Sequence, residues 1–180
     1  RLNQNELRPL GRTARGVRSM NLREGDKLVG MDVLTSELVD QLAKLDCEKD
    51  DSFLDEETQI TDGPWVLVVS SFGLGKRVPV DQFRLQKRAG MGLKAIKFRI
   101  ADDVLVGLKV LGKGEEIILV TEKGVIVRTN ADKISQQSRA ATGVKLQKLD
   151  EGDHLAEVVL VPHEQVEDKE QLIENENENE

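Results

Sequence analysis

One phrase occurs three times along this chain: an arginine, three residues, a glycine, an apolar residue and a basic residue. The copies lie at residues 12–18, 88–94 and 139–145. Each copy is followed by an alternating apolar run, an acidic turn and another apolar run. Recurrence on this scale is typical of repeat architectures, in which each unit buries its apolar face against its neighbours. The repeat therefore predicts similar units in series, each with a basic cluster at the same place.

Alternating apolar runs dominate the units and predict β-strands. Eight such runs lie at 65–69, 76–80, 93–98, 104–110, 116–120, 125–128, 144–149 and 155–161. Near the start only two runs fit, at 17–22 and 28–34. Glycines between the runs suit tight hairpins. An order of two strands, then four, then four predicts an all-β, propeller-like fold with four-stranded blades.

Two segments fall outside the strand pattern. Helical spacing is found at Leu34, Leu38, Leu42 and Leu45. Thr35 or Ser36 precedes this run as a candidate N-cap, and the acidic run 48–57 after it predicts an irregular loop. From residue 164 the chain is acidic and ends in alternating Glu and Asn, a composition that predicts disorder. We therefore expect a blade domain at 1–163 with an acidic insertion at 35–62, and a disordered acidic tail at 164–180.

The net charge of −7 hides a division by region. Residues 1–31 and 64–149 carry +4 and +9, whereas residues 32–63 and 150–180 carry −9 and −11. The body that contains the basic phrases is therefore positive, and the negative charge lies in the insertion and the tail. Phosphate backbone is the first partner that such a body suggests.

Several other classes of protein are disfavoured. The single cysteine, Cys47, excludes an internal disulfide, and no apolar run approaches the roughly 20 residues of a membrane helix, so we expect no membrane partner. His154 and His163 lack a spacing suited to a metal, and no catalytic constellation stands out. We expect Trp65 in the core and Asp102-Asp103 in a turn between strands.

The motifs resemble the C-terminal domain of the A subunit of DNA gyrase. The resemblance rests on residues 8–18 with Glu24-Gly25-Asp26, on Gly73-Leu74-Gly75-Lys76-Arg77, and on residues 124–128 with Ile134-Ser135. Residues 86–92 are similar to the family's box, Gln-Arg-Arg-Gly-Gly-Lys-Gly, at Gln86, Arg88, Gly90 and Gly92, but depart from it at Lys87, Ala89 and Met91. The resemblance implies a six-bladed β-pinwheel, of which this chain would hold the last two and a half blades and the acidic tail.

The same resemblance implies a function. The domain would bind and wrap double-stranded DNA for a type II topoisomerase that uses ATP to introduce negative supercoils. Its partners would be the rest of the gyrase A subunit together with the gyrase B subunit, in a heterotetramer. No cofactor is expected in this chain, because ATP and Mg²⁺ would bind elsewhere in the holoenzyme. Type II topoisomerases cut DNA with a tyrosine, and this chain has none. The implied location is the bacterial cytoplasm, at the nucleoid, or a chloroplast or mitochondrion in a eukaryote.

Basic side chains in the turns and on nearby strands are the candidate DNA contacts. The set in the turns is Arg12, Arg15, Arg18, Lys87, Arg88, Lys94, Arg139 and Lys145. The set on adjacent strands and loops is Lys76, Arg77, Arg84, Arg128 and Lys133. A curved row of cations can follow phosphates without reading bases. The alternative is that these are solvated turns whose charges only keep the protein dispersed.

Other readings stay open at this point. The A subunit of topoisomerase IV has a C-terminal domain whose blades bind DNA without the same wrapping. A propeller-like module could use its basic edge to bind an acidic protein. The acidic tail and the insertion could compete with DNA for the basic surface or touch nothing, and the insertion could also dock through Leu38 and Leu42.

Overall fold

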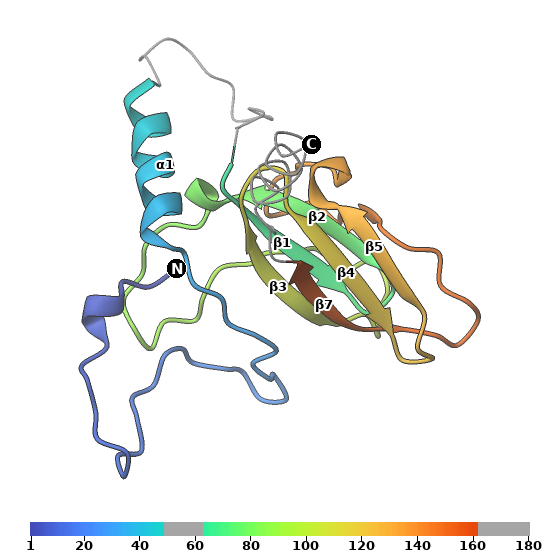
Figure 1. The fold of residues 1–180 in the computed structure, drawn as a ribbon. Helices are drawn as coiled ribbons and strands as arrows, with labels where there is room; N and C mark the ends of the chain where they lie inside the picture. The colour runs from blue at the N-terminus through green and yellow to red at the C-terminus, as the bar shows by residue number, and fades with distance from the viewer. Residues whose placement is uncertain (49–62, 162–180) are drawn as a thin grey trace, which may run out of the picture.

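The computed structural model describes residues 1–48 and 63–161, and it packs two antiparallel sheets face to face (Figure 1). The expected loop at 48–57 and the expected disorder of the tail fall almost wholly outside the described residues. Within them, seven strands, three short 3₁₀ helices and one α-helix follow one another along the chain. The mostly-β fold confirms the predicted fold class.

The first sheet contains β1 (Trp65–Ser70), β2 (Leu74–Pro79), β3 (Leu105–Leu111) and β6 (Val144–Lys145), in the order β3-β1-β2-β6. Strands β1 and β2 form the hairpin that the sequence predicted, with Gly73 at positive φ in the turn. The fourth strand comes from the following repeat, beyond the whole of the second hairpin. The sequence predicted four consecutive strands in each blade. For this blade the predicted third strand, residues 93–98, does not form, and β6 of the next repeat completes the sheet instead.

Two glycines explain how β6 can lie so close to β2. A side chain on Gly75 would meet Leu146 Cδ1 at 2.4 Å, and one on Gly143 would meet the Gly75 carbonyl oxygen at 2.8 Å. Gly143 also has a φ of +97°, a conformation that residues with side chains rarely adopt. The glycine of the third basic phrase thus admits the strand that completes the sheet.

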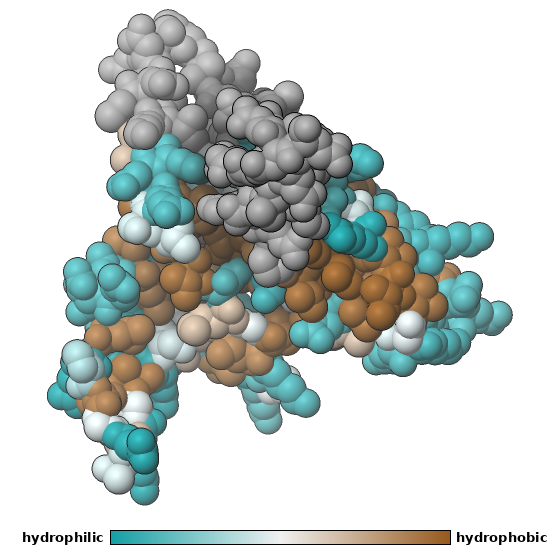
Figure 2. All heavy atoms as spheres, in the orientation of Figure 1, coloured by the Kyte–Doolittle hydropathy of each residue, from teal (hydrophilic) through white to brown (hydrophobic). Residues whose placement is uncertain are grey.

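The second sheet contains β4 (Glu116–Thr121), β5 (Ile126–Asn130) and β7 (Leu155–Val161), in the order β5-β4-β7. The predicted run at 144–149 contributes only its first two residues as a strand, and these join the other sheet. The outer face of the second sheet is open to solvent, with Ile126 65% and Val159 39% exposed. Figure 2 shows apolar side chains gathered over this part of the molecule.

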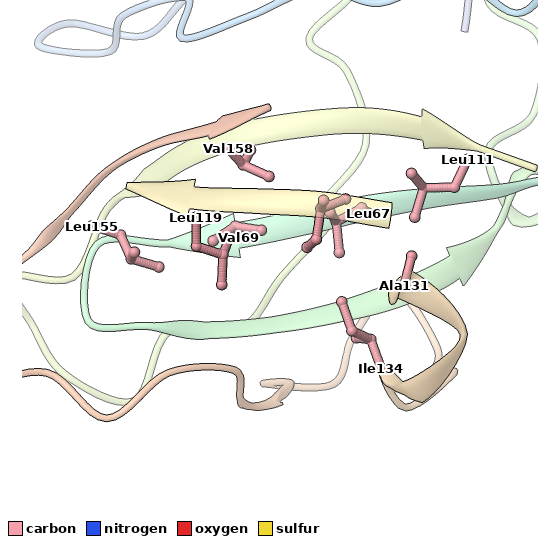
Figure 3. Close-up of a cluster of buried hydrophobic side chains, with 9 residues drawn as sticks. Leu67, Val69, Leu111, Leu119, Ala131, Ile134, Leu155 and Val158 are labelled. Atoms are coloured by element: carbon pink, nitrogen blue, oxygen red, sulfur yellow. The ribbon is translucent and has the colours of Figure 1, made fainter. Parts of the chain in front are cut away.

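The main core lies between the two sheets. Side chains of β1 alternate between two clusters, so that Leu67 and Val69 face the second sheet and Val66 and Val68 face away from it. Figure 3 shows the inner cluster, which the second sheet and its connections complete. Its members are Leu67, Val69, Leu111, Ile117, Leu119, Ala131, Ile134, Leu155 and Val158. Each of the larger side chains stabilises the fold by about 1.5–3 kcal/mol when fully buried.

The outer cluster is covered by the helix and by irregular chain. Helix α1 (Ser36–Glu48) begins after Thr35, whose Oγ1 accepts a hydrogen bond from the Leu38 amide at 3.4 Å, which confirms the predicted cap. Leu34 and Leu42 pack against the outer cluster, whose buried members are Val66, Val68, Val78, Val80 and Ile96. Because Leu42 already contacts the body of this protein, it is not a free docking residue.

The N-terminal unit does not form the strands predicted at 17–22 and 28–34. Its only regular elements are the 3₁₀ helix η1 (Gln4–Glu6) and an isolated bridge from Met20 to Gly90. Leu28, Met31 and Val33 are 61%, 81% and 64% exposed. A strand needs backbone hydrogen bonds with a neighbour, and in the described part of the chain residues 28–34 make none with a strand. They approach the edge strand β3 only through a side chain, since Asp32 Oδ2 accepts from the Val110 amide at 2.8 Å.

The acidic turns have a shared structural role. Asp103 Oδ1 accepts hydrogen bonds from the Ser71 hydroxyl and the Phe72 amide, and Asp153 Oδ1 accepts them from the amides of Lys123 and His154. Each aspartate therefore ties the last turn of its unit to the hairpin that opens the same unit. This confirms the predicted turn at 102–103.

Candidate nucleic-acid interface

The three basic phrases form turns of the same kind. Their glycines, Gly16, Gly92 and Gly143, have φ values of +80°, +80° and +97°. Glycine enters this region at no steric cost, so the chain reverses tightly where the basic residues cluster. Glycine therefore serves the backbone geometry of all three turns.

Successive turns are joined by the same contact. The Asn21 amide, just after the first phrase, donates to the Gly90 carbonyl at 2.9 Å. The Lys97 amide, at the same place after the second phrase, donates to the Ala141 carbonyl at 3.1 Å. Each segment that follows one phrase therefore lies against the turn of the next phrase. The three basic turns form one continuous series.

Ten of the thirteen predicted contact residues are exposed. They are Arg12, Arg15, Arg18, Arg84, Lys87, Arg88, Lys94, Arg128, Lys133 and Lys145. Arg128 is engaged in an ion pair with Glu116, whose Oε2 accepts from Nε at 2.6 Å. Arg18 donates to Asn21 Oδ1 at 3.2 Å. The other exposed members present their charge to solvent, and their contact with DNA stays a prediction.

Arg139 is half-buried at the third turn. Its Nη1 donates to the Lys94 carbonyl at 3.3 Å, and its guanidinium lies 5.9 Å from the centre of the Phe83 ring. These contacts tie the second and third phrases together and still leave guanidinium N–H groups for a ligand.

Lys76 is not a surface contact, which corrects the prediction. Its side chain is fully buried, and Nζ donates to the carbonyls of Ser138, Arg139 and Ala141 at 2.6, 2.8 and 2.8 Å. Burial lowers the pKa of Lys76 to about 8, and the nearby charge of Arg139 acts in the same direction. The buried ammonium therefore holds the third turn from beneath.

Arg77 is also largely withdrawn from solvent. Its guanidinium donates to Asp132 Oδ1 at 2.8 Å and to the Ile134 carbonyl at 2.9 Å, and it stacks 4.4 Å from the Trp65 ring centre. Trp65 is 4% exposed and donates to Gln136 Oε1, which confirms it as a core residue. Arg77 thus joins the first sheet to η3 (Ala131–Lys133) of the next unit.

Two further exposed basic residues lie beside the third turn and were not among the predicted contacts. Lys97 and Arg99 are exposed and follow the second phrase, where the segment passes the third turn. The signal was available, because Lys94, Lys97 and Arg99 all fall within or beside one predicted strand. The repeated phrase ends at residue 94, so the repeat alone does not single out the two residues beyond it.

The described residues give no metal cluster and no membrane-spanning helix. Among residues 1–48 and 63–161, no cluster of three His, Cys, Asp or Glu side chains could hold a metal ion. No helix in those ranges is long and apolar enough to cross a membrane. His154 stacks edge-on against Phe72 at 5.1 Å and approaches Glu122, while His163 lies outside the described residues.

Comparison with known proteins agrees with this geometry. A family described as "DNA gyrase C-terminal domain, beta-propeller" matches residues 1–35, 64–111 and 115–162. This chain belongs to that family. The three matched stretches correspond to the three repeat units, and helix α1 lies in the unmatched stretch between the first two.

Curated relatives support the assignment. The A subunit of DNA gyrase from Synechocystis sp. is 48% identical over 165 residues, which cover 88% of this chain and 19% of the relative. The A subunit of DNA gyrase from Staphylococcus epidermidis is 38% identical over 164 residues, which cover 91% of this chain and 16% of the relative. The chain therefore spans less than a fifth of the length of these relatives.

Two solved structures share the fold. A structure of the DNA gyrase A C-terminal domain aligns with a TM-score of 0.65 at 24% identity, covering 89% of this chain and 46% of that chain. The C-terminal domain of DNA topoisomerase IV aligns with a TM-score of 0.71 at 21% identity, covering 97% and 47%. At these identities the likeness concerns the fold.

Proposed function

We propose that this chain is the DNA-binding and DNA-wrapping part of a gyrase A subunit, and that it binds duplex backbone through its basic turns. The observation that carries the proposal is the repeated contact between successive turns, from Asn21 to Gly90 and from Lys97 to Ala141. Because the contact recurs, the turns are linked in series, and their exposed cations would follow one another along a single path, as a phosphate backbone requires.

Attraction between the basic turns and DNA phosphates would have to offset the cost of bending the duplex. Bending a site of 20–30 base pairs by 40–90° costs about 1–6 kcal/mol. Each neutralised phosphate makes the negative slope of log K against log salt steeper by about 0.9. Several such contacts offset the bending cost at low salt. We therefore expect binding that tolerates any sequence and weakens steeply as salt rises.

Two matched variants test the interface. Arg88→Gln/Lys145→Gln removes one exposed cation from each of two turns, and Lys27→Gln/Lys123→Gln removes the same charge elsewhere. Fluorescence anisotropy measures binding to a duplex of about 30 base pairs at several salt concentrations. For the first pair of substitutions, the slope of log K against log salt should be about 2 less steep than in wild type. The second pair should change the slope by less than about 1. Equal slopes for both pairs, or a wild-type affinity that ignores salt, would contradict the proposal.

The role of the whole protein is proposed from its relatives, which are named as A subunits of DNA gyrase. Joined to the rest of the gyrase A subunit, with a B subunit that would hold ATP and Mg²⁺, the chain would present a wrapped segment for strand passage in the bacterial cytoplasm. Topoisomerase IV is the second candidate, because a solved C-terminal domain of that enzyme shares the fold. A topology assay on relaxed circles separates the two: negative supercoiling supports gyrase, and relaxation alone supports the sibling enzyme.

The acidic tail is a separate question within this proposal. Residues 164–180 would compete with DNA for the basic turns, since a tethered segment acts at high effective concentration. Deletion of these residues should tighten DNA binding in low salt. Unchanged affinity would show that the tail does not reach the turns.

A further inference from the structure

A buried lysine lies directly beneath one of the exposed basic turns. Lys76 sits on β2, and its Nζ donates to three carbonyls of the turn that carries Arg139. The side chain is fully buried, so it cannot reach a DNA phosphate itself. An ammonium has three protons, and here all three have a backbone acceptor.

The direction of those carbonyls fixes the direction of the following amides. The C=O and N–H groups of a trans peptide point to opposite sides. Because the carbonyls of Arg139 and Ala141 point at Nζ, the amides of Ala140 and Thr142 point away from it. Ala140 is exposed and Thr142 is half-exposed, so both amides face the outer side of the turn.

These two amides differ from their neighbours. The amides of Arg139, Ala141 and Gly143 donate to Gln82 Oε1, the Ser138 carbonyl and Gln137 Oε1 at 3.1, 3.2 and 3.0 Å. The amides of Ala140 and Thr142 have no acceptor among the residues that the structure describes. Two free N–H groups of one turn that point to the same side can both donate to one anion, although the Ala141 amide between them is already bonded.

We propose that the turn 139–142 is a phosphate-binding site made by the Ala140 and Thr142 amides and the Arg139 guanidinium, and that Lys76 is the positioning residue that holds these amides outward. The ligand is a phosphodiester of duplex DNA, so the inference rests on the proposed function and adds a specific subsite to it. The same three groups would also accept a free phosphate, and the experiment below uses both.

The second turn lacks this arrangement. At the corresponding place, the Ala89 amide donates to the Ser19 carbonyl at 2.7 Å and Ala89 has a φ of +59°. No lysine lies beneath that turn in the described residues; instead, Asn21 donates to the carbonyls of Ala89 and Gly90. The subsite is therefore expected at the third turn and not at the second.

The ammonium can also be removed without mutation. Burial lowers the pKa of Lys76 to about 8, helped by Arg139, which is the charged group that faces it. The residue opposite on β1 is the apolar Val68, and Lys145 on β6 lies opposite Leu74 with an exposed side chain. Above about pH 8 the neutral amine has two protons for three carbonyls, so the turn loses one of its bonds.

Two kinds of measurement test the proposal with the whole chain. Lys76→Met should weaken binding to a duplex of about 30 base pairs by about tenfold, the scale of one lost charge-assisted hydrogen bond. Lys123→Met, which removes a lysine whose Nζ donates to one turn carbonyl outside the basic phrases, that of Glu151, should change the affinity less than about threefold. Arg139→Met should weaken binding too, and the double variant Lys76→Met/Arg139→Met should lose much less affinity than the product of the two single losses.

Wild-type affinity for the duplex should fall between about pH 7.5 and 9, and the affinity of Lys76→Met should stay constant over that range.

Nuclear magnetic resonance gives a readout that does not depend on any variant. Saturating DNA should shift the amide protons of Ala140 and Thr142 downfield, and high inorganic phosphate should shift the same two signals. The amide of Ala141, which already has an acceptor, serves as the internal control. Unmoved Ala140 and Thr142 signals, additive losses in the double variant, or a Lys76→Met protein that binds like wild type would overturn the subsite. If the wild-type chain binds no duplex at all, the proposed function itself is wrong.

Discussion

Strands β2 and β5 occupy the same position in successive units, yet the corresponding arginine is largely buried on β2 and exposed on β5. Arg77 on β2 corresponds to Arg128 on β5, and Lys76 corresponds to Val127. The Arg77 side chain is 11% exposed and joined to the next unit, whereas the Arg128 side chain is 64% exposed and pairs with Glu116 of its own sheet. The difference teaches that a repeat position takes its role from what covers it, since β2 has a following unit over it and β5 has none in the described residues.

The largest expected effect separates the two arginines in stability. Arg77→Ala should lower the free energy of unfolding by about 2 kcal/mol, because it leaves the Ile134 carbonyl without its donor and removes the guanidinium from the Trp65 ring and from Asp132 Oδ1. Arg128→Ala should cost less than about 1 kcal/mol, as exposed ion pairs do. Urea unfolding of both variants checks this, and equal losses would show that the next unit does not protect Arg77.

The second prediction concerns pH and the lysine of β2. The pKa of Lys76 lies at about 8 in the folded chain, below its ordinary value of 10.5. Between these values the unfolded chain binds more protons than the folded chain, so the free energy of unfolding rises with pH over this window. Urea unfolding at about pH 7.5 and pH 10 should show a gain of about 2 kcal/mol in wild type that Lys76→Met lacks. A similar gain in the variant would place the titrating group elsewhere.

The third prediction compares Gly75 with Ile126, its counterpart on β5. Gly75→Ala should cost about 1–3 kcal/mol, because the new methyl group would meet Leu146 at 2.4 Å and the Val68 carbonyl oxygen at 2.9 Å. Ile126→Ala, on the uncovered strand, should change the free energy of unfolding by less than about 0.5 kcal/mol. Thermal unfolding of the two variants gives the comparison. An unchanged free energy of unfolding for Gly75→Ala would mean that β6 does not pack closely against β2.

The smallest expected effect is on DNA affinity. Arg128 is exposed but engaged by Glu116, so Arg128→Gln should weaken duplex binding by no more than about threefold in low salt. Glu116→Gln frees the guanidinium and should tighten binding by a similar factor. Anisotropy titrations of the two variants check the pair, and an effect of Arg128→Gln as large as that of Arg88→Gln/Lys145→Gln would contradict the view that the ion pair restrains it.

Sequence patterns predicted the strands well where burial decides the structure. Continuous apolar runs predicted β1, β4 and β7 within a residue or two, and glycines predicted the hairpin turns. Exchange of β6 between units could not be predicted, because an alternating run shows that a segment is a strand and not which sheet it joins. The runs at 17–22 and 28–34 failed for the same reason, since a strand depends on a neighbour.

The candidate site was predicted in outline and missed in one detail. The three phrases predicted turns with exposed cations, and the turns are there. The burial of Lys76 could have been foreseen, because it lies two residues before Val78 and so on the same face of β2 as that buried side chain. Its three carbonyl partners could not, because they belong to a turn more than 60 residues away.

The place of β6 has a consequence for how the units can be rearranged. Since Val144 and Lys145 complete a sheet that begins at Trp65, the boundary between units in sequence is not a boundary in space. Removing the last unit would strip the edge strand β6 from the sheet of the unit before it. Tension that a curved duplex applies to the third turn would likewise pass through backbone hydrogen bonds into the first sheet, and not through a flexible linker.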